Sequence, residues 1–153
     1  MNTTPLSFCA FALLMLTAFD AGAQCRKFTK QRVISTLDAG QAIDQIQAGT
    51  LGRGESAAAV LEVSASGTVD LLISTHPDLG EVGFNVVTAS GRSLAEGTTV
   101  GTVTTLPLQV EAAEDLIVHV TSQKTSGAYT PIGCVSLVTT QPIPENVIAQ
   151  SKQ

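Results

Sequence analysis

The chain has 153 residues, with eight Lys and Arg against thirteen Asp and Glu and a formal net charge of −5. That length suits one domain with one core, since two halves with separate cores would each be implausibly small. Because binding to phosphate backbones requires clustered Lys and Arg, the acidic balance argues against a nucleic-acid partner.

An apolar run from Leu6 to Phe19 opens the chain. A helix of that length spans about 21 Å, short of the ~30 Å hydrocarbon core of a membrane. The run ends at the small residues Ala21-Gly22-Ala23, which signal peptidase accepts. Residues 1–23 are therefore predicted to be a secretory signal peptide and not a transmembrane anchor, which places the mature protein in the periplasm or outside the cell. Two features are unusual for a signal: no Lys or Arg precedes the run, and Asp20 lies beside the cleavage site.

Two of the three cysteines remain after cleavage, because Cys9 leaves with the signal. Cys25 and Cys134 form an even pair in a chain bound for an oxidising compartment, which predicts a disulfide. The bond would close a loop of about 110 residues and stabilise the fold by roughly 4 to 5 kcal/mol. The alternative is two free or intermolecular thiols. Gln24 before Cys25 argues against lipidation, whose signal requires a small residue there.

Four bases crowd the new amino terminus: Arg26, Lys27, Lys30 and Arg32. They predict a solvated basic arm, with contact to a membrane or a nucleic acid as the alternative reading. The rest of the mature chain is net acidic, so any contact with an acidic surface would be confined to this arm.

Short β-branched runs follow, separated by turn residues at intervals of roughly eight to twelve positions, a pattern typical of sandwiches and barrels. The predicted strands are residues 33–37, 41–47, 57–63, 68–74, 82–88, 100–104, 106–111, 115–121 and 128–139. Turns are predicted between them, including Ser90-Gly91 and Glu96-Gly97. Pro131 inside the last strand predicts an edge position or a bulge.

These eight or nine strands predict an all-β fold, a two-sheet antiparallel β-sandwich of jelly-roll type. Residues 24–140 would form this single domain. Residues 141–153 contain two prolines and no alternation, so they are predicted to be a disordered tail.

Residues 49–138 contain four segments that resemble, in order, the bacterial pre-peptidase C-terminal (PPC) domain, a small β-sandwich often appended to secreted proteases. The segments are Gly-Thr-Leu-Gly at 49–52, Ser-Ala-Ser-Gly-Thr-Val-Asp-Leu-Leu-Ile at 64–73, Ala-Ser-Gly-Arg-Ser-Leu at 89–94, and the closing pair at 112–120 and 126–130. The chain departs from the family pattern near Ala57, which lacks the usual aromatic residue, and at Pro131, where an aliphatic residue is usual. The resemblance implies a sandwich fold and no particular activity.

No motif for catalysis or metal binding is found. No serine lies in Gly-x-Ser-x-Gly, and His119 is predicted to point to solvent from its strand. Calcium requires several oxygen ligands from one loop, and neither Asp78 with Glu81 nor the pair Glu114-Asp115 has the spacing of a known calcium loop. Solvated turn carboxylates are the simpler interpretation. We therefore predict no catalytic residue, no metal and no cofactor.

The mature chain has only three aromatic residues, Phe28, Phe84 and Tyr129. Sugars and single-stranded nucleic acids are bound by stacking on aromatic faces, so this composition argues against both ligands. Phe84 is predicted to lie in the core, and Tyr129 at its rim with the hydroxyl available for binding.

The leading hypothesis is a non-catalytic secreted or periplasmic module that binds an unknown extracytoplasmic protein or assembles with it at the cell envelope. Pairing at a sheet edge leaves little trace in a sequence, which suits the lack of motifs. The candidate binding residues are His76, Asp78, Glu81, Tyr129, Arg26, Lys27, Lys30 and Arg32. The alternative is a small secreted hydrolase or a metal-dependent enzyme that uses the loop from His76 to Glu81.

Overall fold

The computed structural model describes residues 24–101, 103–123 and 132–143. Within them a helix covers residues 24–34, and eight strands and one short 3-10 helix follow. The elements are β1 (Gln41–Gly52), β2 (Ser56–Leu61), β3 (Gly67–Thr75), η1 (Pro77–Leu79), β4 (Glu81–Thr88), β5 (Ser93–Val100), β6 (Val103–Val110), β7 (Leu116–Ser122) and β8 (Ile132–Pro142).

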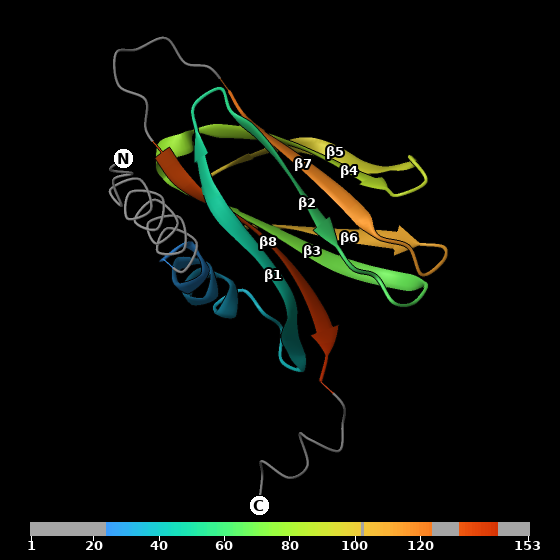
Figure 1. Cartoon of the computed structure of the whole chain (residues 1–153). Helices are drawn as coiled ribbons and strands as arrows, with labels where there is room; N and C mark the ends of the chain where they lie inside the picture. Colours follow the sequence, from blue (N-terminus) through green and yellow to red (C-terminus); the bar gives the residue numbers. More distant parts are fainter. Residues whose placement is uncertain (1–23, 102, 124–131, 144–153) are drawn as a thin grey trace, which may run out of the picture.

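The eight strands form two four-stranded antiparallel sheets, in the orders β1-β8-β3-β6 and β2-β7-β4-β5 (Figure 1). We call them sheet A and sheet B. β1 pairs with β8, β2 with β7, β3 with β6 and β4 with β5, so the chain runs as one long hairpin. Rolling that hairpin up brings β3 beside β8 and β4 beside β7. This is the jelly-roll arrangement, and the predicted fold class is confirmed.

Alternation along β4 and β7 of sheet B directs apolar side chains into the core between the sheets. On β7, Leu116, Val118 and Val120 are buried, while the intervening residues are more exposed. Sheet A supplies Leu71 and Ile73, both fully buried, to the same cluster. Each such side chain stabilises the fold by roughly 1.5–3 kcal/mol relative to its exposed state.

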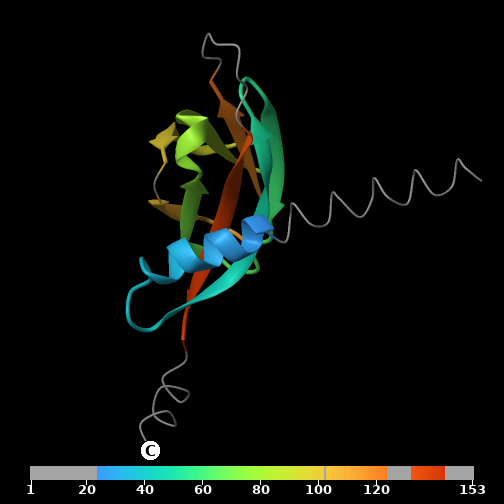
Figure 2. The same cartoon turned by 90° about the vertical axis from the view of Figure 1, so that its left-hand side faces the viewer.

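The helix was missed by the sequence analysis, which predicted a solvated arm followed by a strand at 33–37. Residues 24–34 are helical, and Figure 2 shows this helix crossing the outer surface of sheet A. Its buried side is Cys25, Thr29 and Val33, at intervals of four residues, with exposed fractions of 1%, 0% and 0%. Val33 packs with Leu72 and Val138 in a second apolar cluster outside the sheet. The helix therefore covers an apolar surface that water would otherwise reach.

Three smaller predictions were also wrong. Glu96 and Gly97 lie inside β5 and not in a turn. The predicted strand 100–104 contains Gly101, whose φ of 56° turns the chain between β5 and β6. β8 continues through Gln141 and Pro142, which pair with the start of β1. Residues 1–23 of the predicted signal peptide, Tyr129, Pro131, and residues 144–153 of the predicted tail lie outside the described residues.

Candidate functional site

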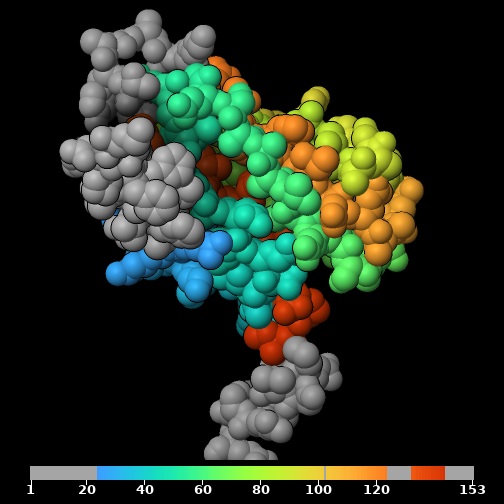
Figure 3. Space-filling model, in the orientation of Figure 1, coloured from blue at the N-terminus to red at the C-terminus, as the bar shows by residue number. Residues whose placement is uncertain are grey.

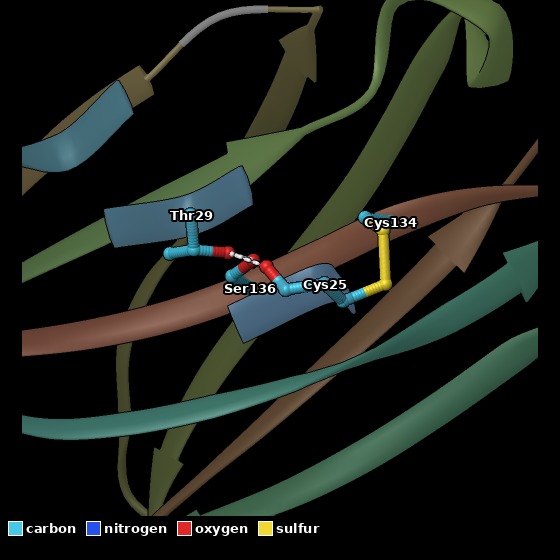
Figure 4. The surroundings of a disulfide bond; sticks show 4 residues. All are labelled: Cys25, Thr29, Cys134 and Ser136. Carbon is cyan, nitrogen blue, oxygen red and sulfur yellow. Dashed lines mark hydrogen bonds between the residues drawn. A yellow bond between two sulfur atoms is a disulfide. The ribbon is translucent and has the colours of Figure 1, made fainter. Parts of the chain in front are cut away.

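The predicted disulfide joins Cys25 of the helix to Cys134 of β8. Their Cα atoms are 5.4 Å apart, within the usual range for a disulfide. One turn further along the helix, the Thr29 hydroxyl donates to the Cys25 carbonyl oxygen (2.7 Å) and is hydrogen-bonded to the Ser136 hydroxyl (Figure 4). The helix is thus fixed to β8 by a covalent bond and a buried polar contact.

Arg32 holds the other end of the helix and is not part of a solvated arm. Its two Nη atoms donate to the carbonyl oxygens of Thr75 (2.8 Å) and Gly101 (2.7 Å), at the ends of β3 and β5. Its guanidinium lies 5.2 Å from the centre of the Phe28 ring, a cation–π distance. Arg32 therefore connects the helix to the end of β3 and to the turn after β5. Its predicted binding role stays a prediction.

The other three bases of the predicted arm, Arg26, Lys27 and Lys30, are exposed on the outer side of the helix. Ile34 lies on the same side with 61% of its surface exposed. Part of this side is visible in Figure 3 at the lower left of the molecule. These three side chains are available to solvent, as predicted, but they project from an ordered helix.

The loop from His76 to Glu81 does not bring its three candidate residues together. The Nδ1 atom of His76 accepts a hydrogen bond from the Asp78 backbone N–H (3.1 Å) and lies 3.5 Å from Asp78 Oδ2. Glu81 instead accepts a hydrogen bond from the side chain of Gln123 (2.9 Å). The His76 ring packs beside Phe28, with centroids 5.5 Å apart. His76 thus caps the short helix η1 and packs against the helix at residues 24–34.

The described residues contain no group of three His, Cys, Asp or Glu side chains that could hold a metal ion. Across the same ranges, no helix is long and apolar enough to cross a membrane. His119 is exposed on the outer face of sheet B, and Phe84 is 8% exposed in the core; both placements agree with the sequence analysis.

Glu114 has a structural role at the β4–β5 turn. The Ser90 hydroxyl and then the Ser90 backbone N–H, which is 2.5 Å from Glu114 Oε1, lower the pKa of this carboxyl below its usual value of 4.5. A lowered pKa in the folded state contributes stability above the unfolded pKa, and this contribution is lost as the pH falls through the folded value.

Glu114→Gln should therefore reduce stability at neutral pH, and the difference from the parent protein should shrink as the pH falls below about 4.5. Urea denaturation at pH values between about 7 and about 3 measures this difference. A difference that stays constant over that range would contradict the assigned hydrogen bonds.

A groove between the edge strands β1 and β2 was not predicted. It encloses about 220 Å³. Its lining is mostly apolar, although Gln47 and Thr50 of β1 add polar atoms. The residues that shape it are Gly49 on β1, Ala57 and Ala59 on β2, and Val120, Val135 and Leu137 below them. The signal in the sequence is Ser56–Leu61 (Ser-Ala-Ala-Ala-Val-Leu), a strand without charge, glycine or proline.

A side-chain clasp closes one end of this groove. The amide of Gln45 on β1 donates to the Glu62 carbonyl oxygen (2.6 Å) and accepts from the Glu62 backbone N–H (3.0 Å). The clasp imitates one pair of strand-to-strand hydrogen bonds. In the described structure, no strand is hydrogen-bonded to the outer edge of β2 from Ser56 to Leu61.

No protein-family model and no curated protein matches the chain. Among solved structures, it is similar to the carbohydrate-binding module CBM36 in complex with calcium and xylotriose, at 12% identity over 66% of this chain and 92% of that chain, with a TM-score of 0.34. It is similar to the CBM36-1 domain of a multidomain xylanase from the hindgut metagenome of Trinervitermes trinervoides, at 6% identity over 68% and 92% of the two chains, with a TM-score of 0.38. It is also similar to FLHE, at 18% identity over 68% and 99%, with a TM-score of 0.33. At TM-scores this low, none of these likenesses indicates a function for this chain, and the resemblance to the PPC domain stays a prediction.

Proposed function

We propose that this chain is an exported, non-catalytic module that binds another extracytoplasmic protein by adding a strand of that protein to the free edge of β2. The supporting observation is the contrast between β2 and the other sheet edges. An edge strand presents unpaired backbone N–H and C=O groups, and proteins usually protect such edges with charges, proline or bulges.

Three of the four edge strands carry a protective feature. β1 has a register shift between Ile43 and Gln45, with the exposed Asp44 inside it. β5 carries the exposed Glu96, and its pairing with β4 also shifts register. β6 has Pro107 near its middle, which removes one backbone donor. Each of these three edges therefore resists pairing with a further strand.

β2 carries none of these features within its described residues. Its pairing with β7 runs without a register shift from Ser56 to Leu61. Ser56, Ala57 and Ala58 are exposed, and Val60 has 51% of its surface exposed. An apolar, regular and open edge is the surface to which an extended peptide adds by backbone hydrogen bonds.

Export and the lack of catalysis are parts of the same proposal. The predicted signal peptide and the disulfide between Cys25 and Cys134 support an oxidising compartment, either periplasmic or extracellular. Glu81 is hydrogen-bonded to Gln123, and the described residues contain no cluster of three His, Cys, Asp or Glu side chains that could hold a metal ion. This supports a binding module over the alternative metal-dependent enzyme, whose metal would need such a cluster.

A photo-crosslinking amino acid at position 58 tests the proposal in the native cell envelope. We expect one adduct of defined mass, because residue 58 lies beside the free edge of β2. The matched control places the same amino acid at Thr98, which is exposed on β5 at the opposite edge of sheet B. Val60→Lys, which puts a charge on the edge, should abolish the adduct. Equal adducts at positions 58 and 98, or none at position 58, would contradict the proposal.

A further inference from the structure

The groove between β1 and β2 exposes part of the sandwich interior. Figure 3 shows a hollow between the atoms of β1 and those of β2, with atoms of β8 visible at its bottom. The floor residues Val120, Val135 and Leu137 belong to the main core cluster. The hollow is therefore continuous with the core and is not a shallow depression in a polar surface.

The smallest side chains of the two edge strands leave this space open. A Cβ atom added to Gly49 would meet no atom within 4 Å. Across the groove, Ala57 and Ala59 present only methyl groups. Atoms that line an unfilled space lose the dispersion contacts they would make in a packed core. An apolar occupant would recover those contacts.

The size of the groove limits what can occupy it. The six residues of β2 span about 20 Å, the length of an equally long partner strand. A cavity of about 150 Å³ holds one benzene molecule, so the 220 Å³ of the groove has room for about two medium-sized side chains. On an extended segment, side chains on one face recur at every second residue.

The charges near the clasp indicate the polarity of the occupant. Asp44 and Glu62 are both exposed at the end of the groove where Gln45 bonds to Glu62. Neither carboxylate forms an ion pair with a described residue. A Lys or Arg at that end of a bound segment would meet two negative charges.

We infer that the groove binds an extended segment of another protein, about six residues long. The segment pairs with β2, places apolar side chains at alternate positions into the groove, and carries a Lys or Arg at the end beside Asp44 and Glu62. This inference rests on the proposed function and specifies which segment of the partner is recognised.

A second copy of this chain is a poorer occupant. If two β2 edges paired, each would direct Ala57, Ala59 and Leu61 toward its own core, where Leu61 is already fully buried. No side chain of the second β2 would then fill the groove of the first. An extended segment of another protein does not pack its inward side chains into a sandwich core of its own. Its alternate side chains can therefore enter the groove.

Titration with synthetic octapeptides tests the inference. The panel alternates Thr with Val, Ile or Leu and carries one Lys at either end, and binding is followed by NMR shifts of the β2 amides. We expect one of the two Lys placements to bind more tightly. Methylation of alternate backbone nitrogens should weaken binding by about tenfold or more, because it removes the donors and keeps the side chains.

Gly49→Leu fills the groove and should weaken peptide binding by about tenfold or more. The matched control is Gly83→Leu on the outer face of sheet B, where an added Cβ makes only ordinary contact, 3.7 Å from the Thr121 carbonyl oxygen. That variant should bind within about twofold of the parent protein. Glu62→Gln should weaken binding of the preferred Lys peptide severalfold and reduce its salt dependence. Thermal denaturation verifies that each variant is folded.

The inference and the proposed function can fail separately. If position 58 gives its adduct and the adduct persists in Gly49→Leu, the partner uses the edge without the groove, and the inference is overturned while the proposed function stands. If no peptide binds, or if deletion of residues 144–153 is needed before any peptide binds, the groove does not take a foreign strand in the full chain. Dimerisation that Gly49→Leu abolishes would assign the groove to a second copy and would also overturn the inference.

Discussion

Replacing both Cys25 and Cys134 by serine should lower the free energy of unfolding by about 4 to 5 kcal/mol. The bond joins residues 109 positions apart, so it removes a large part of the conformational freedom of the unfolded chain. It also fixes the helix over the apolar cluster of Val33, Leu72 and Val138. Urea denaturation followed by circular dichroism measures the loss. A whole domain of this size has a net stability of only about 5–15 kcal/mol, so the variant should unfold at a much lower temperature.

Reduction of the parent protein supplies the control for this variant. The reduced protein and the double serine variant should have the same stability, since both lack the bond and keep the helix sequence. The dependence of unfolding free energy on urea should become steeper in both, because an unfolded chain without the cross-link exposes more surface. A loss below about 1 kcal/mol would show that the bond does not constrain the fold as described.

Leu71→Ala should cost about 2–5 kcal/mol of stability. Leu71 is fully buried at the centre of β3, where it faces the main core and pairs with Leu106 and Thr139 on the two neighbouring strands. Truncation removes buried methylene and methyl groups and leaves a cavity. β3 is hydrogen-bonded to β8 and β6 on its two sides, so it cannot shift to fill that cavity. Chemical denaturation of the variant and the parent protein gives the difference directly.

Ile132→Ala is the matched control for Leu71→Ala. Ile132 is also aliphatic and also lies on a strand of sheet A, but 69% of its surface is exposed. Its truncation should change stability by less than about 0.5 kcal/mol. Equal losses in the two variants would contradict the assignment of Leu71 to the core.

The strands and the disulfide could be predicted because their signals are local or compositional. Alternation of apolar and polar residues marks β4 and β7 directly, since one face of each strand packs against the other sheet. Cys25 and Cys134 are the two cysteines outside the predicted signal peptide, so they form a single candidate pair.

The helix could not be recognised from apolar spacing because its buried side is chemically mixed. Cys25 and Thr29 satisfy their positions by a disulfide and by hydrogen bonds, and only Val33 is an ordinary apolar residue. A sequence pattern does not show that Cys25 and Thr29 contact Cys134 and Ser136 of β8, so these two positions do not look buried. The β-branched run at 33–37 also favours a strand by intrinsic preference, and tertiary packing overrode it.

A turn was predicted at Glu96-Gly97 because of the glycine, but that glycine is explained by side-chain packing inside β5. Gly97 lies opposite Phe84 in the β4–β5 ladder. A Cβ atom at Gly97 would be 3.0 Å from Phe84 Cζ. The glycine therefore makes room for an aromatic ring in a small core, a requirement that depends on a residue thirteen positions earlier.

The position of β8 determines when sheet A can form. β8 lies between β1 and β3, and β1 has no other strand partner in the described sheets. β8 follows the other seven described strands in the chain, so β1 cannot pair with it until those strands have also been synthesised. Contacts between residues this distant in sequence slow folding into the range of milliseconds to seconds or longer. Sheet A can therefore be completed only once β8 is available, and a truncated product that lacks β8 would be an aggregation-prone fragment.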